Sequence, residues 1–138
     1  MTHNIYAASS WRNEQYNTVV TQMRNWGHTV YNFREGFSFH WSNIDTEWQK
    51  WDAVKYRGVL IQHPYPAQGF MSDYRAMLWA DTCVLILPCG RSAHLEAGWF
   101  CGAHKRCIIL LADGEPELMN LIATDICVDI HELKKALQ

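Results

Sequence analysis

Short apolar or β-branched runs alternate along the chain with segments whose apolar residues recur every three or four positions. Short continuous runs predict strands buried in a sheet, whereas the longer spacing predicts helices that bury one face. Strands are therefore expected at residues 5–8, 29–33, 82–88, 106–112 and 126–128, and helices at residues 11–26, 44–61, 72–80, 92–103, 116–123 and 130–137. This alternation predicts an α/β fold, a three-layer sandwich formed by residues 1–138 as a single domain.

The segments between these elements carry signals of their own. Ser9, Ser10 and Ser92 are of the residue type that caps helices, and Gly27 is expected to end the first helix. Pro64 is expected to break the chain between the second and third helices, because proline has no amide donor.

Composition narrows the range of partners. The net charge is −2, so the chain has no basic field with which to hold a nucleic-acid polymer. A small nucleotide stays possible, since a few local donors suffice for one phosphate. The longest apolar runs are too short to span a bilayer, and the first residues do not resemble a signal peptide, so no membrane partner is expected.

Five cysteines without a C-x-x-C pair favour free thiols in a reducing compartment, and a cytoplasmic location is therefore expected. The cysteines and histidines do not follow the ligand spacing of a zinc site, so no metal is expected.

The segment after the expected strand at residues 82–88 is the most informative for chemistry. Ligands of parallel sheets bind beyond the carboxyl ends of the strands. There, Gly90 and Arg91 lead into a helix on which Ser92 and Glu96 share one face. Free amide groups of the first helical turn beside a carboxylate would form an anion pocket. The alternative is that Glu96 only complements the helix dipole.

Four further residues have two interpretations each. Asp73 and Asp81 are either functional acids or, respectively, a helix cap and a turn residue. Tyr6 lies either at the ligand edge or in the core. Cys89 comes just before a helix, where a thiolate would be stabilised, and is a minor candidate nucleophile.

Aromatic residues cluster after the second expected strand. Phe37, Phe39 and Trp41 lie in a loop at the ligand edge, where their rings could stack on a flat base. The alternative is a core or a subunit interface, which is the interpretation preferred for Trp48 and Trp51.

Four segments, taken in order, resemble the nucleoside 2-deoxyribosyltransferase-like superfamily, which includes the transferases and the deoxyribonucleoside 5′-monophosphate N-glycosidases. They are Ile5–Asn13 (IYAASSWRN), Gly27–Phe33 (GHTVYNF), the pair Asp73 and Asp81, and Gly90–Gly98 (GRSAHLEAG). The resemblance implies a flavodoxin-like sheet of about five parallel strands. It also implies a homo-oligomer whose sites borrow residues from a neighbour, and no cofactor.

The resemblance also implies roles for individual residues. Glu96 would be the carboxylate nucleophile that attacks C1′, Asp73 would pass a proton to the departing base, and Tyr6 would orient the nucleophile. The other implied substrate contacts are Ser9, Arg12, Arg91 and Ser92 around a 5′-phosphate with Gly90 in the same turn, and Asp81 as a structural or sugar-contacting acid.

These residues suit cleavage of the N-glycosidic bond of a small nucleoside or nucleotide. The reaction builds positive charge on the sugar, which a carboxylate below C1′ stabilises and can trap as a covalent glycosyl intermediate. The sugar would then pass to water or to another base. Two alternatives stay open: an NAD-type N-glycosidase and a non-catalytic nucleotide-binding module.

Overall fold

The structure, a computed structural model, describes all of residues 1–138, which divide into two compact units. Unit 1 comprises Met1–Asn32 and Ala76–Gln138, and unit 2 comprises Phe33–Arg75. Unit 1 carries the whole sheet, and unit 2 is most of the chain segment between the second and third strands. That residues 1–138 form a single domain stays a prediction.

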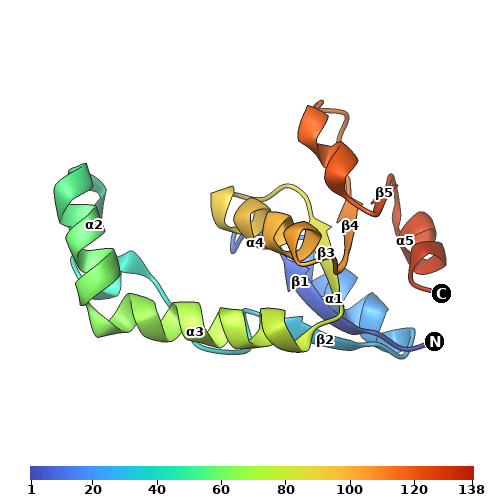
Figure 1. Cartoon of the computed structure of the whole chain (residues 1–138), viewed down its shortest axis with the longest axis horizontal. Coiled ribbons are helices and arrows are strands. Elements are labelled where there is room, and N and C mark those ends of the chain that lie inside the picture. The colour runs from blue at the N-terminus through green and yellow to red at the C-terminus, as the bar shows by residue number, and fades with distance from the viewer. The chain divides into compact units, whose positions relative to one another are not determined.

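Unit 1 is built on one sheet of five parallel strands in the order β2-β1-β3-β4-β5 (Figure 1). The strands are β1 (Asn4–Ala8), β2 (Thr29–Asn32), β3 (Thr82–Ile86), β4 (Arg106–Leu110) and β5 (Asp125–Cys127). Every residue of β3 is buried, as expected for a continuous apolar strand that is covered on both faces. The predicted α/β fold with a parallel sheet is confirmed.

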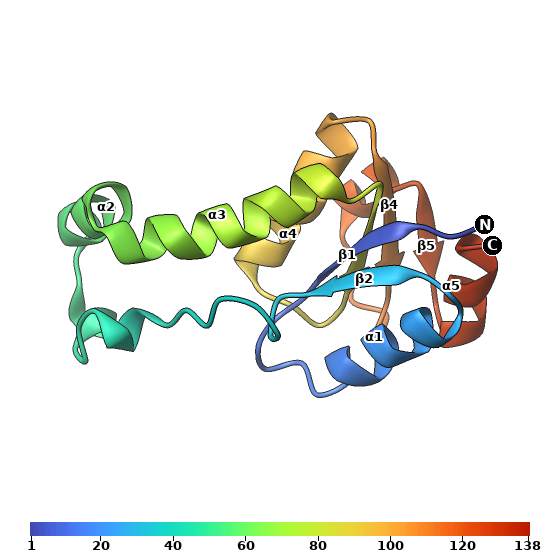
Figure 2. The same cartoon turned by 90° about the horizontal axis from the view of Figure 1, so that it is seen from below.

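Three helices cover the faces of this sheet. Figure 2 shows α1 (Tyr16–Asn25) and α5 (Ile130–Ala136) on one face and α4 (Arg91–Gly102) on the other, which makes three layers. The side chains that α1 buries recur at the helical spacing and are Tyr16, Val19, Val20 and Met23. Gly27 follows α1 with φ at +99°, so the predicted glycine stop is confirmed.

None of the three serines predicted to cap these helices does so. Helix α1 begins only at Tyr16, and Ser10 instead accepts a hydrogen bond from the Arg12 amide at 3.2 Å. Helix α4 begins at Arg91 with Gly90 as the preceding cap residue, so Ser92 lies inside the helix.

The single helix predicted for residues 44–61 in unit 2 is wrong. Two short 3-10 turns, Trp41–Asn43 and Trp48–Lys50, precede α2 (Ala53–Gln62). The Asp45 carboxylate accepts hydrogen bonds from the Glu47 amide and the Trp51 indole, and such side-chain bonds compete with a helix. The Asp52 side chain then caps α2 by accepting from the Lys55 amide.

Pro64 separates two helices as predicted, but it also begins the second one. Helix α3 spans Pro64–Trp79, eight residues longer at its start than predicted, because proline is well suited to the first helical position. Asp73 therefore lies inside α3, and its interpretation as a helix cap is wrong. The short helix predicted at residues 116–123 is a 3-10 helix, Leu118–Ile122. None of the helices combines the length and the apolar character that a bilayer crossing needs.

Candidate active site

A row of side chains crosses the sheet under α4. Tyr31, Tyr6, Cys83 and Cys107 occupy paired positions on β2, β1, β3 and β4. The Tyr6 ring stacks on Tyr31 at a centroid distance of 5.3 Å and lies 5.7 Å from the ring of Phe100 on α4. Because Tyr6 is 1% exposed and Phe100 is fully buried, this packing fixes the direction of the Tyr6 hydroxyl.

The Tyr6 hydroxyl points at Glu96 and donates a hydrogen bond to its Oε2 atom. Glu96 lies one turn before Phe100, in the amino-terminal half of α4, which is the half nearer in sequence to the carboxyl end of β3. Its side chain is half-buried. The structure thus brings together two residues 90 positions apart that the resemblance had paired. A buried tyrosine that holds one carboxylate oxygen leaves the other oxygen in a defined direction, which is what a carboxylate nucleophile requires.

Asn13 holds the loops beside this pair and was not predicted as a site residue. Its Nδ2 atom donates to Ser9 Oγ at 3.0 Å and lies 3.2 Å from the carbonyl oxygens of Ile86 and of Pro88. The Ser9 hydroxyl donates to the same Ile86 carbonyl at 2.7 Å. Asn13 therefore ties the loop after β1 to the loop after β3. Its place in the segment of resemblance is the only sequence signal for this role.

The residues predicted to surround a phosphate lie in the same two loops. The Ser9 hydroxyl donates its single proton to the Ile86 carbonyl, so it can only accept a hydrogen bond from a ligand. Arg12, Gly90, Arg91 and Ser92 are exposed. Contact of these residues with a phosphate stays a prediction.

Cys89 does not have the stabilised thiolate predicted for it. Burial and the nearby Glu96 carboxylate raise the pKa of the Cys89 thiol to about 11. A raised pKa favours the protonated thiol, so it does not support the stabilised thiolate, and a nucleophilic role of Cys89 stays a prediction.

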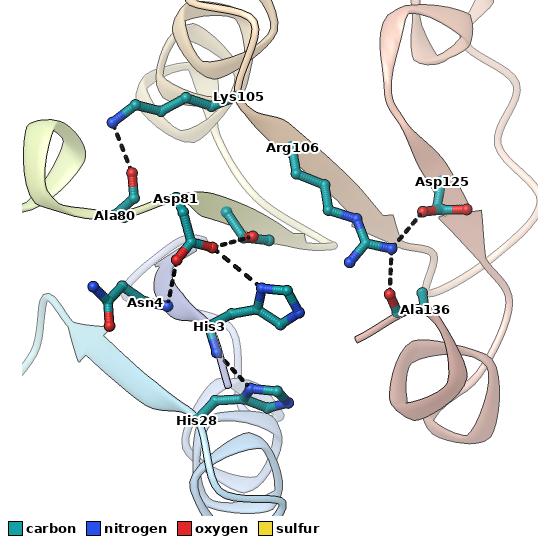
Figure 3. Close-up of polar contacts among 10 residues, drawn as sticks. His3, Asn4, His28, Ala80, Asp81, Lys105, Arg106, Asp125 and Ala136 are labelled. Atoms are coloured by element: carbon teal, nitrogen blue, oxygen red, sulfur yellow. Dashed lines mark hydrogen bonds and ion pairs between the residues drawn. The ribbon is translucent and has the colours of Figure 1, made fainter. Parts of the chain in front are cut away.

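Asp81 precedes the amino end of β3, whereas the loop that leads to Glu96 follows the carboxyl end of that strand. Figure 3 shows Asp81 beside His3 and Asn4. Its carboxylate accepts hydrogen bonds from the Asn4 amide at 2.9 Å and from the Thr82 hydroxyl at 2.7 Å, and it lies 3.3 Å from His3 Nδ1. Partial burial opposes the charge, but these partners hold the pKa of Asp81 below its usual range. This position favours the structural role over a sugar contact.

In unit 2 the predicted aromatic residues pack together. Phe39 stacks on Tyr65 at 4.7 Å and meets Trp41 edge-on at 4.7 Å. A Cβ atom at Gly69 would lie 3.3 Å from the Phe39 ring, so a glycine lets α3 approach closely. Phe39 and Trp41 are half-buried in this aromatic cluster, whereas Phe37 is 36% exposed and presents ring surface to solvent.

Asp73 is half-buried on α3 and belongs to unit 2, whereas Glu96 and Tyr6 belong to unit 1. The structure therefore brings Tyr6 and Glu96 together within one unit, and the predicted role of Asp73 stays a prediction. No group of three or more His, Cys, Asp and Glu side chains is arranged to hold a metal ion.

Comparison with known proteins gives no match to a protein-family model or to a curated protein sequence. Among solved structures, a 2-deoxyribosyltransferase from the psychrotolerant bacterium Bacillus psychrosaccharolyticus is similar, with a TM-score of 0.66 and 18% identity over 97% of this chain and 90% of that one. The CMP N-glycosidase BcmB of Clostridium botulinum has a TM-score of 0.56 and 18% identity over 99% and 97% of the two chains.

The chain shares the fold of these two proteins. A conserved protein from Enterococcus faecalis V583 shares it, with a TM-score of 0.65 and 14% identity over 96% and 95% of the two chains. The similarity extends over almost the whole chain in all three cases. Sequence identities this low support a shared fold only, so the evidence for any chemistry comes from the arrangement of the site residues.

Proposed function

We propose that this chain is an enzyme that cleaves the N-glycosidic bond of a nucleoside or nucleotide, with Glu96 as the nucleophile. The observation that carries the proposal is the hydrogen bond from the buried Tyr6 hydroxyl to the Glu96 carboxylate. The shared fold supports it, since two proteins with this fold are a 2-deoxyribosyltransferase and a CMP N-glycosidase.

In the proposed first step, a carboxylate oxygen of Glu96 forms a bond to C1′ of the sugar while the bond from C1′ to the base nitrogen breaks. The electron pair of that bond leaves with the base, and Asp73 supplies the proton that neutralises it. Tyr6 keeps the carboxylate aligned with C1′, which lowers the entropic part of the barrier.

In the second step, water or another base attacks C1′, and the bond to Glu96 breaks so that its carboxylate is restored. The proton lost by the attacking water, or by the ring nitrogen of the attacking base, returns to Asp73. Hydrolysis and transfer share every residue of this scheme, so the acceptor is decided by the access of water to the intermediate.

Substrate contacts complete the proposal. The loops that Asn13 ties together present Ser9, Arg12, Gly90, Arg91 and Ser92, which we propose to meet a 5′-phosphate. Phe37 would present its exposed ring surface to a flat ring. Tyr65 contacts both Phe37 and Phe39, and Phe39 in turn contacts Trp41, so these rings form one connected cluster.

The test is release of free base from a panel of ribo- and deoxyribonucleosides, their 5′-monophosphates and NAD, separated by chromatography. Substituting Glu96→Gln is expected to lower base release by at least about a thousandfold, because the nucleophile is lost. Glu14→Gln, which alters an exposed glutamate of unit 1, is the matched control and is expected to keep full activity.

Tyr6→Phe is expected to lower the rate by about ten- to a hundredfold, since it removes one hydrogen bond to a charged group. Thermal unfolding of each variant checks that it is folded. Base release by Glu96→Gln at the rate of Glu14→Gln would overturn the proposal. So would thermal stabilisation by nucleotides without base release from any member of the panel, which indicates a binding module.

A further inference from the structure

Unit 2 contains an open cavity of about 610 Å³, whose lining shares only Phe37 with the substrate contacts proposed above. Its volume lies in the range of small-molecule sites. The lining residues come from the loop after β2 and from α3 and are Phe37, Ala67, Gln68, Met71, Ser72 and Arg75.

The α3 side of the cavity is a stripe of the helix. Gln68, Met71 and Arg75 are three and four positions apart, so they share one face. Gln68 and Arg75 are seven positions apart, which corresponds to about 10 Å along the helix axis. The cavity thus has an amide at one end, a guanidinium at the other end and a thioether between them.

The middle of the cavity is apolar and has an aromatic wall. Phe37 and Met71 are 36% and 39% exposed, so both present surface to a ligand. The Phe37 ring lies 5.3 Å from the Tyr65 ring, which supports it from behind. A ring face and a polarisable sulfur are the surfaces that suit a flat aromatic ligand.

The polar groups at the two ends are available to a ligand. Arg75 is the only charged residue in the lining, and it forms no ion pair within the chain. The Gln68 side-chain amide forms no hydrogen bond within the chain. A guanidinium only donates and pairs best with phosphate or carboxylate, whereas an amide both donates and accepts, as the edge of a nucleobase does.

We propose that this cavity is a binding site for a flat heteroaromatic ring that carries an anionic group at some distance, as a nucleoside monophosphate does. The ring lies between Phe37 and Met71, its polar edge meets Gln68, and its phosphate meets Arg75. The choice of a nucleotide as the ligand rests on the proposed function, whereas the site itself lies wholly within unit 2 and uses none of the phosphate contacts proposed in unit 1.

The test uses the full chain carrying Glu96→Gln, so that ligands are not consumed. Binding is measured by calorimetric titration with the four common deoxynucleoside 5′-monophosphates, the matching nucleosides and inorganic phosphate. We expect at least one monophosphate to bind about tenfold or more tightly than its nucleoside, and inorganic phosphate to bind weakly, since it lacks the ring.

Adding Arg75→Ala is expected to weaken the binding of the monophosphate about tenfold or more and to leave the nucleoside unchanged. Arg75→Lys should recover part of the loss, because it keeps the charge without the planar fork. Gln68→Ala should change the order of preference among the bases. The matched control is Arg57→Ala, an exposed arginine of α2 outside the cavity, which should bind as the parent does.

Equal affinity of the Arg75→Ala and Arg57→Ala proteins for every monophosphate would overturn the inference, as would equal binding of nucleosides and monophosphates. Base release by the unsubstituted chain is scored separately. If base release depends on Glu96 but Arg75→Ala does not weaken binding, the proposed function is supported and the proposed cavity site is overturned. If Arg75→Ala weakens binding but the chain releases no base, the cavity site is supported and the proposed function is overturned.

Discussion

The two units of the chain are organised by different physical means. In unit 1 the strands and α4 bury a continuous set of apolar side chains, among them Ile108 and Phe100 at 0% exposure. In unit 2 only Pro66 is buried, and α2 buries no residue at all. Unit 1 is therefore stabilised mainly by packing, whereas unit 2 depends on capping, ring contacts and side-chain hydrogen bonds.

This contrast bears on function. The Tyr6–Glu96 pair needs a fixed geometry and lies on the packed unit, where Phe100 and Tyr31 hold the ring. The proposed nucleotide cavity lies on the unit with little buried surface, where the side chains can adjust to a ligand. Rigid elements suit groups that react, whereas segments that bind ligands are often among the less stable parts of a fold.

The largest expected difference between the two units is in the free energy of unfolding, and a matched pair of isoleucine-to-alanine substitutions tests it. Ile108→Ala on β4 should lower the free energy of unfolding by about 2–5 kcal/mol, because it leaves a cavity in the core. Ile61→Ala on α2, where the side chain is 72% exposed, should change it by less than about 0.5 kcal/mol.

Urea unfolding measures both values. A loss of about 2 kcal/mol for Ile61→Ala would contradict the contrast, since it would mean that α2 is covered in solution. Repeating the titration at two protein concentrations would then show whether a second copy provides the cover.

A smaller effect is expected at the loops beside Glu96. Asn13→Ala removes the amide that ties the loops after β1 and β3, and it leaves the Ile86 carbonyl with the Ser9 hydroxyl as its side-chain donor. We expect a loss of about 1–3 kcal/mol in unfolding free energy, together with slower base release. Asn25→Ala, at the exposed end of α1, is the control and should have little effect on either. If Asn13→Ala and Asn25→Ala had the same unfolding free energy and the same rate of base release, Asn13 would not hold the two loops together.

The smallest effect is the pH dependence of stability, which we expect to arise at the amino edge of unit 1. Burial lowers the pKa of His28, and the neighbouring His3 lowers it further. Below the ordinary pKa of about 6.5 the unfolded chain therefore takes up a proton that the folded chain resists, so stability falls as the pH falls. The pKa of Asp81 is also lowered, so its contribution is present above about pH 4 and is lost at more acid pH.

Urea unfolding midpoints, measured from pH 7.5 to pH 3 in steps of about 0.5 pH unit, would show both pH ranges in which stability falls. His28→Asn keeps an acceptor for the His3 amide and should flatten only the window below pH 6.5. If the slope in that window survives the substitution, His28 is not its source.

The sequence by itself determined the sheet and its order of elements. The apolar runs that became β1, β3 and β4 are continuous and short, and the stripe of α1 has a clear period, so local patterning was sufficient. In unit 2 the patterning was misleading, because Asp45 and Asp52 hold turns through side-chain bonds where apolar spacing predicted one helix.

Only the tertiary structure decided the functional geometry. The contact between Tyr6 and Glu96 spans 90 positions, and the tie made by Asn13 spans more than 70 positions to Ile86 and Pro88. The pKa of Cys89 depends on burial and on Glu96, which no local pattern describes. The local pattern of apolar residues is enough to predict where strands and helices form, whereas a site arises from residues that meet only after those elements have packed.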